Sequence, residues 1–208
     1  MSRRLGALLA VVALAPGLAA CSSDSGTLPF DVNPPDVQVD TPQLRKVKAR
    51  IGMDDCAPGS GQAVEGGLPS VTLPCLGGGR DVDLAALRGP MVVNLWQGFC
   101  EPCEKEMPAL QEFHEQHGDR VAVLGIDFND VKPGAALELA GDTGATYASV
   151  ADPGGELMAE DAFAIARRGL PAFVFVDADG MVVGQHSGGV ESAGEVEELV
   201  QQYLGIDL

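Results

Sequence analysis

The sequence predicts an α/β fold with a central mixed β-sheet flanked by helices. Two apolar runs rich in β-branched residues, MVVNLW at 91–96 and VAVLGID at 121–127, are typical of buried strands, and a helical pattern separates them. A third run, FVFVD at 173–177, precedes an Asp-Gly turn and a further apolar run, which indicates a β-hairpin. The strand-helix-strand order favours a parallel pair, to which the hairpin adds antiparallel strands.

The helices are predicted from the spacing of apolar residues. In the segment 103–117, Met107, Leu110 and Phe113 recur on one face, and Gly118 follows as a stop. The remaining elements are two short strands at 70–73 and 147–150, a helical turn at 83–89 that Gly89 closes, and helices at 134–141, 156–166 and 192–204, the last with Ser192 as its N-cap.

The first twenty residues are typical of an export signal. Arg3 and Arg4 precede an apolar stretch that is short for a membrane span and is interrupted by Pro16 and Gly17. We therefore expect residues 1–20 to be a signal peptide and the mature protein to be extracytoplasmic.

The end of this signal, Leu18-Ala19-Ala20-Cys21, resembles the lipobox of bacterial lipoproteins. The resemblance implies cleavage before Cys21 and lipidation of that cysteine, with a lipid anchor in the cell membrane as the result. The alternative is an ordinary secretory signal followed by a chance cysteine.

The rest of the chain divides into three predicted parts. Residues 21–43 are rich in Ser, Asp and Pro and are expected to form a disordered tether. Residues 44–67 form an N-terminal extension, in which the segment 44–51 suits either a strand or a helix. Residues 68–208 carry the regular pattern and form the main domain.

The net charge restricts the partners. The chain of 208 residues has a formal net charge of −17, and the predicted signal contributes only positive charge to that sum. Nucleic acid is therefore excluded as a partner, because binding it requires clustered Lys and Arg. Anionic lipid head groups would also repel this surface, so membrane attachment is expected to be covalent.

Cys100 and Cys103 form a CxxC motif after the predicted strand 91–96 and at the start of a predicted helix. A helix N-terminus presents free N–H groups and the positive end of the dipole, and both stabilise a thiolate. We therefore assign Cys100 as the nucleophile and Cys103 as the resolving cysteine that attacks the mixed disulfide. Pro102 suits the first helical turn because it has no N–H to leave unpaired.

The stretch VVNLWQGFCEPCEKEMPAL resembles the active-site region of TlpA/ResA-type thioredoxin-like proteins, whose pattern is roughly NFWxxWCxPCxxEMP. A second stretch, Gly169-Leu170-Pro171 followed by AFVFVDADG, resembles the later motif of the same family. The resemblance covers roughly residues 66–205 and implies a thioredoxin-like fold with thiol–disulfide exchange on exported proteins. One departure is Phe99, which stands where the family usually has Trp.

The same resemblance implies roles for several residues. Pro171 is expected to be cis and to face the CxxC motif, with the backbone of Leu170 pairing with an extended substrate. Trp96 and Phe99 are expected to contribute to substrate binding. The implied partners are exported proteins with thiols or disulfides, apocytochrome c among them, and a membrane electron donor of the thioredoxin-reducing type. No cofactor and no metal are implied.

Glu106 is the candidate for proton handling. On a helix it shares a face with Cys103, and a carboxylate beside a buried thiol can take up its proton. Asn94 cannot be that base, although other thioredoxins have an acid at its position. The alternative is that Glu106 is only a good helix former.

Cys56 and Cys75 are left once the CxxC motif and Cys21 are assigned. We expect them to form a structural disulfide that ties the N-terminal extension to the domain. The alternatives are a second redox pair and a four-cysteine metal site. The metal site would need another CxxC-type pair of ligands.

The sequence thus predicts an oxidoreductase, and Glu101, Glu104 and Glu106 favour the reducing direction because negative charge disfavours the thiolate. The first alternative is an oxidase that forms disulfides in exported proteins. The second is a non-catalytic or metal-delivery module.

Overall fold

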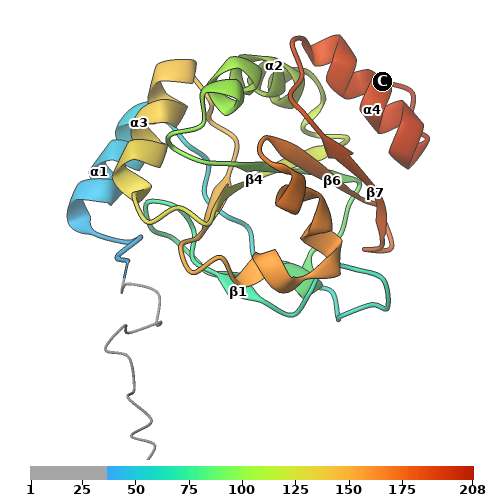
Figure 1. Cartoon of the computed structure of the whole chain (residues 1–208), viewed down its shortest axis with the longest axis horizontal. Coiled ribbons are helices and arrows are strands. Elements are labelled where there is room, and N and C mark those ends of the chain that lie inside the picture. Colours follow the sequence, from blue (N-terminus) through green and yellow to red (C-terminus); the bar gives the residue numbers. More distant parts are fainter. Residues whose placement is uncertain (1–36) are drawn as a thin grey trace, which may run out of the picture. The chain divides into compact units, whose positions relative to one another are not determined.

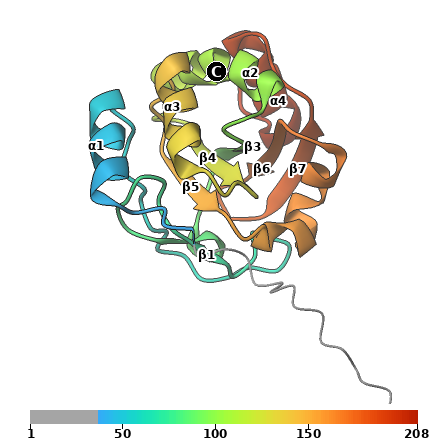
Figure 2. The ribbon, with the colours of Figure 1, turned by 60° about the vertical axis from the view of Figure 1, so that its left-hand side comes forward.

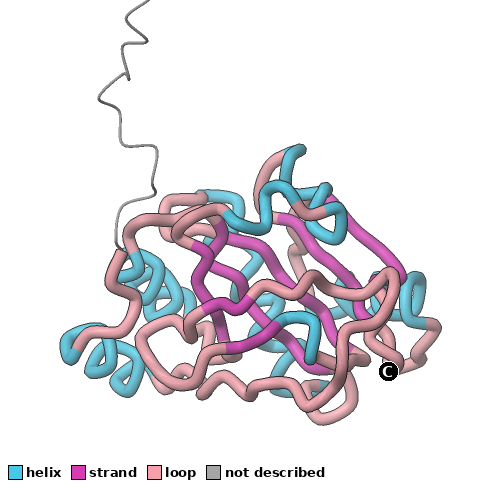
Figure 3. Tube along the Cα trace, turned by 90° about the horizontal axis from the view of Figure 1, so that it is seen from below, coloured by secondary structure: helices cyan, strands magenta, loops and turns pink. Residues whose placement is uncertain are grey.

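The computed structural model describes residues 37–208, so the predicted signal peptide, Cys21 and most of the predicted tether lie outside the described residues. The described chain contains a five-stranded sheet with strand order β5-β4-β3-β6-β7, seen from below in Figure 3. Its strands are β3 (Met91–Trp96), β4 (Ala122–Phe128), β5 (Ser149–Asp152), β6 (Ala172–Val176) and β7 (Val182–Ser187).

The pairing within the sheet is mixed. Strands β3, β4 and β5 run parallel, whereas β6 is antiparallel to both β3 and β7. The predicted parallel pair and the predicted hairpin are therefore both present, and the mixed α/β fold is confirmed.

The α-helices cover one face of the sheet, and the short elements cover the other. Helices α2, α3 and α4 lie together over one face, and α1 packs beside α3 (Figures 1 and 2). Within residues 37–208 the α-helices are α1 (Pro42–Ile51), α2 (Glu101–His117), α3 (Pro133–Thr143) and α4 (Ala193–Leu204). The short elements are the hairpin β1 (Thr72–Leu73) and β2 (Val82–Asp83) and the 3-10 helices η1 (Leu84–Ala86), η2 (Glu156–Ala159) and η3 (Asp161–Arg168). None of the helices in residues 37–208 is long and apolar enough to cross a membrane.

The alternation of side chains along the strands produces two cores. In β3, Val92 and Trp96 face the α-helices, whereas Val93 and Leu95 face the short elements. All six residues of β3 are buried, which explains why the strand reads as a continuous apolar run.

Three expectations about the elements need correction. The segment 156–166 forms two 3-10 helices instead of one α-helix, and the backbone at Phe163 (φ −117°, ψ 17°) departs from helical geometry. Strand β2 was not predicted. The ordered chain begins before residue 44, because Val39 is buried and the Thr41 side chain accepts a hydrogen bond from the Leu44 N–H at 3.2 Å to start α1.

Candidate functional site

The CxxC motif lies between the end of β3 and the first turn of α2. Cys100 and Cys103 form a disulfide with a Cα–Cα distance of 5.1 Å. Cys100 is partly exposed, whereas the Cys103 side chain is fully buried in the core under α2. The two sulfur atoms therefore differ in access, and an external thiol or disulfide meets Cys100 first.

The start of α2 provides the electrostatic environment of Cys100. Cys100 is the N-cap residue, and its Sγ accepts a hydrogen bond from the Cys103 N–H at 3.3 Å. Pro102 occupies the first turn, as the sequence predicts. The N–H groups and the helix dipole favour a thiolate on Cys100 after reduction.

The loop before Cys100 is held by the loop that follows β4. The Gln97 side chain donates hydrogen bonds to the carbonyl oxygens of Phe128 at 2.8 Å and Asn129 at 3.1 Å. The Gly98 N–H donates to the Asp130 carboxylate at 2.9 Å. Sequence reasoning missed Asp130. The only feature of the sequence that could have indicated Asp130 is its position just after a buried strand.

Gly98 is required by close packing against α3. A β-carbon at Gly98 would lie 2.7 Å from the backbone nitrogen of Ala136 and 2.9 Å from the carbonyl carbon of Ala135. A glycine at this position therefore allows the redox loop to contact the first turn of α3. This contact gives a physical reason for Gly98, although Gln97-Gly98 departs from the usual pattern of the family.

We expect Gly98→Ala to lower the free energy of unfolding by about 1–3 kcal/mol, because backbone atoms of α3 cannot yield to the added methyl group. Denaturant unfolding measures this change. Gly194→Ala is the matched control, since nothing closer than 3.8 Å meets its β-carbon and alanine favours the helix there. Equal stability of both variants would contradict the packing argument.

Pro171 directly precedes β6, at the end of the strand that lies beside the redox loop. The Leu170–Pro171 peptide bond is cis, Pro171 is buried and Leu170 is half-buried. Because Leu95 pairs with Ala172, the start of β6 lies next to the end of β3. A β-carbon on Gly189 would lie 3.4 Å from both Pro171 Cγ and Glu106 Oε2, so Pro171 and Glu106 flank the same glycine.

Phe99 and Trp96 lie in opposite environments. The Phe99 ring is 68% exposed, and the Lys132 ammonium stands 4.5 Å from its centroid. Trp96, which we expected to contact substrate, is fully buried because the last residue of β3 points into the core under the α-helices. Phe99 alone of these two aromatic residues can therefore meet a substrate directly.

Glu106 lies on α2, one turn after Cys103, and is buried with only 1% of its surface exposed. Burial raises the pKa of its carboxyl group to about 8, although a hydrogen bond from Asn94 and the backbone N–H of Val190 favour the ionised form. The Asn94 Nδ2 donates to Glu106 Oε1 at 2.8 Å, a partnership that sequence reasoning missed. At neutral pH Glu106 is therefore mostly protonated, and it adds less negative charge to the site than we expected.

The exposed acids at the start of α2 remain close to Cys100. Glu101 and Glu104 occupy the first turn, and Glu101 forms an ion pair with Lys105 at 2.8 Å. That hydrogen-bonded lysine lowers the pKa of Glu101. Glu104 forms no ion pair among the contacts of residues 37–208, although its charge also acts on Lys105. Both acids place negative charge at the helix start, and this charge opposes a thiolate.

Cys56 and Cys75 form a second disulfide with a Cα–Cα distance of 5.8 Å. Cys75 pairs with Val150 at the edge of the sheet, and Cys56 belongs to the loop after α1. This bond connects the N-terminal extension to the main domain.

A partly exposed cysteine at a helix N-terminus, bonded to a buried one on a thioredoxin-like fold, defines a thiol–disulfide oxidoreductase. The chain belongs to the Redoxin family, which matches residues 63–203. Among curated relatives, it is 28% identical over 129 residues to the thiol-disulfide oxidoreductase ResA of Halalkalibacterium halodurans, covering 61% of this chain and 67% of that protein. It is also 28% identical over 140 residues to the thiol:disulfide interchange protein DsbE of Pseudomonas fluorescens biotype C, covering 67% and 75%.

Solved structures share the fold. A secreted thiol-disulfide isomerase from Corynebacterium glutamicum aligns with a TM-score of 0.55 at 21% identity, over 67% of this chain and 86% of that one. StoA from Bacillus subtilis aligns with a TM-score of 0.51 at 22% identity, over 62% and 98%. These likenesses establish the thioredoxin-like architecture of the described chain.

Proposed function

We propose that this protein exchanges thiols and disulfides with exported proteins, apocytochrome c among them, and acts mainly as a reductase. The observation that carries the proposal is the unequal burial of the two cysteines at the start of α2, with Cys100 accessible and Cys103 enclosed. The relatives named ResA and DsbE support the exchange chemistry. The exposed charge of Glu104 supports the reducing direction, because it disfavours the reduced thiolate form.

In the reducing direction the Cys100 thiolate attacks one sulfur of a substrate disulfide. The substrate S–S bond breaks, a mixed disulfide forms on Cys100, and the other substrate sulfur leaves as a thiolate. Cys103 then gives up its proton and attacks Cys100, which closes the protein disulfide and releases the reduced substrate.

Glu106 is the proposed proton carrier for Cys103. Both residues are buried on α2, and a carboxyl group with a pKa of about 8 can exchange a proton near neutral pH. Leu170, Pro171 and Phe99 are proposed to bind the substrate segment, the first through its backbone as an added strand.

The proposed location is extracytoplasmic, with a lipid on Cys21 as the anchor and a membrane protein of the thioredoxin-reducing type as electron donor. The signal-like residues 1–20 and the lipobox-like sequence support this proposal. Mass spectrometry of the protein from a bacterial membrane tests it, because lipidation adds acyl chains to an N-terminal Cys21. An unmodified Cys21 would overturn the anchor.

The direction of the reaction is tested by the reduction potential of the Cys100–Cys103 pair in dithiothreitol or glutathione buffers. We expect a potential near or below that of thioredoxin, about −270 mV. A potential near −120 mV, typical of strong oxidants, would support the oxidase instead. The absence of a reversible couple would favour a non-catalytic binding module.

A further inference from the structure

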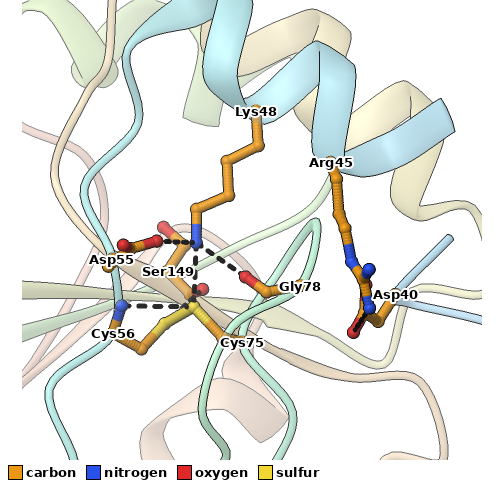
Figure 4. A network of polar contacts seen from close by, with 8 residues as sticks. All are labelled: Asp40, Arg45, Lys48, Asp55, Cys56, Cys75, Gly78 and Ser149. Atoms are coloured by element: carbon orange, nitrogen blue, oxygen red, sulfur yellow. Dashed lines mark hydrogen bonds and ion pairs between the residues drawn. A yellow bond between two sulfur atoms is a disulfide. The ribbon is translucent and has the colours of Figure 1, made fainter. Parts of the chain in front are cut away.

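The Cys56–Cys75 disulfide has a buried cation directly beside it. Lys48 reaches from α1 toward the disulfide, and its Nζ lies 3.2 Å from Cys75 Sγ (Figure 4). The lysine is only 5% exposed, which is rare for an ammonium group unless it is paired. The nearby Arg45 is not a second cation for this site, because its guanidinium pairs with Asp40 at 2.8 Å.

The three N–H donors of the Lys48 ammonium meet three acceptors. The Gly78 carbonyl oxygen lies at 2.8 Å and Asp55 Oδ1 at 3.2 Å, and the third acceptor is Cys75 Sγ. The Asp55 side chain is 92% exposed, so solvent weakens that ion pair. A disulfide sulfur is a weak acceptor, whereas a thiolate in the same place is a strong one.

The two cysteines have opposite surroundings. Cys75 Sγ receives the Lys48 ammonium and the Cys56 backbone N–H, the latter at 3.3 Å, and both favour a thiolate. Cys56 Sγ lies 3.2 Å from the carbonyl oxygen of Ser149, which favours a protonated thiol that can donate to it. The structure therefore suits a reduced state with a thiolate on Cys75 and a thiol on Cys56.

Both cysteines are buried, Cys56 with 3% and Cys75 with 1% of its surface exposed, but they differ in how the chain around them is held. Cys56 lies between the exposed residues Asp55 and Ala57, in the loop after α1, whereas Cys75 is fixed to the sheet edge through Val150. A surface hollow lined by Lys48, Asp54, Asp55 and the glycines 77–79 adjoins the disulfide.

We propose that Cys56–Cys75 is a second redox centre, reduced by an external dithiol that attacks Cys56 while Lys48 stabilises Cys75 as the leaving thiolate. In the first step a dithiol sulfur bonds to Cys56 Sγ, the Cys56–Cys75 bond breaks, and its electron pair stays on Cys75. The second thiol of the reductant then displaces Cys56, which takes up a proton. The reductant leaves as a disulfide, and two electrons have passed to the protein.

The first test uses the full wild-type chain, native, with glutathione as a monothiol probe, followed by acid quenching. Both cysteines lie between Arg50 and Arg80, so one tryptic peptide carries them and fragmentation locates the adduct. We expect glutathione on Cys56 with Cys75 free. Glutathione mainly on Cys75, or no adduct until denaturant is added, would overturn the proposal and leave a purely structural disulfide.

The second test compares Lys48→Met with the matched control Lys46→Met, an exposed lysine on the same helix. In dithiothreitol buffers we expect Lys48→Met to shift the Cys56–Cys75 equilibrium toward the disulfide by about 10-fold or more, and Lys46→Met to leave it unchanged. Equal constants for both variants would overturn the role of Lys48. The Cys100–Cys103 couple, read from its own peptides in the same samples, reports separately on the proposed exchange function.

Discussion

Replacing Cys103 with serine will lower turnover with a disulfide substrate by at least roughly 1000-fold and will leave substrate bound to Cys100. Cys100 remains accessible at the start of α2 and can still attack, but the buried sulfur that releases the mixed disulfide is gone. Non-reducing electrophoresis and mass spectrometry with a disulfide-containing protein substrate measure the trapped complex. Insulin is a suitable probe.

Cys100→Ser provides the comparison. It is expected to be equally inactive but to trap nothing, because the remaining Cys103 thiol is fully buried. Comparable trapping by both variants would contradict the assignment of the accessible cysteine as nucleophile. Ser192→Ala, at the N-cap of α4, serves as a control for mild destabilisation without loss of the cysteines.

Glu106→Gln will make the protein increasingly more stable than wild type as the pH rises from about 4.5 to about 8. The carboxyl group has a pKa of about 8 in the folded chain against 4.5 as its ordinary value. Within that interval the folded state keeps a proton that the unfolded state has lost, so wild-type stability falls with rising pH. The difference amounts to on the order of 4 kcal/mol across the interval, because each pKa unit corresponds to about 1.4 kcal/mol.

Urea unfolding at a series of pH values measures this dependence. Glutamine keeps an oxygen that can accept the hydrogen bond from Asn94, so the substitution changes the charge and little of the geometry. Glu104→Gln is the matched control, because it removes a carboxyl group from the exposed side of the same helix and leaves the buried Glu106 in place. A constant difference between Glu106→Gln and wild type would show that the folded carboxyl group titrates normally.

Much of the fold could be predicted because the sequence pattern of its central elements agrees with their burial in the folded protein. Strand β3 is buried on both faces and therefore reads as an unbroken apolar run, and Ser192 caps α4 as its sequence position indicates. The 3-10 helices η2 and η3 could not be predicted, since their apolar residues Leu157 and Phe163 also suit an α-helix. Their form depends on how they pack against the sheet.

The parts of the site that depend on residues close together in the sequence could be predicted. The parts that depend on contacts between distant segments could not. The CxxC spacing predicts the Cys100–Cys103 pair directly. The hydrogen bond from Asn94 to Glu106 joins a strand to a helix, and a second contact to Glu106 comes from the backbone of Val190, far along the chain. The position of Lys48 beside Cys75 likewise follows from the packing of α1, which no local pattern specifies.

The central position of β3 has a consequence for biogenesis. This strand pairs on one side with β4, which follows soon in the chain, and on the other with β6, where Met91 meets Val176 and Leu95 meets Ala172. Contacts between such distant segments form slowly and only after the later segment is available. A chain that emerges from its N-terminus during synthesis would therefore present both CxxC sulfur atoms to its surroundings before β6 can complete the core that encloses Cys103.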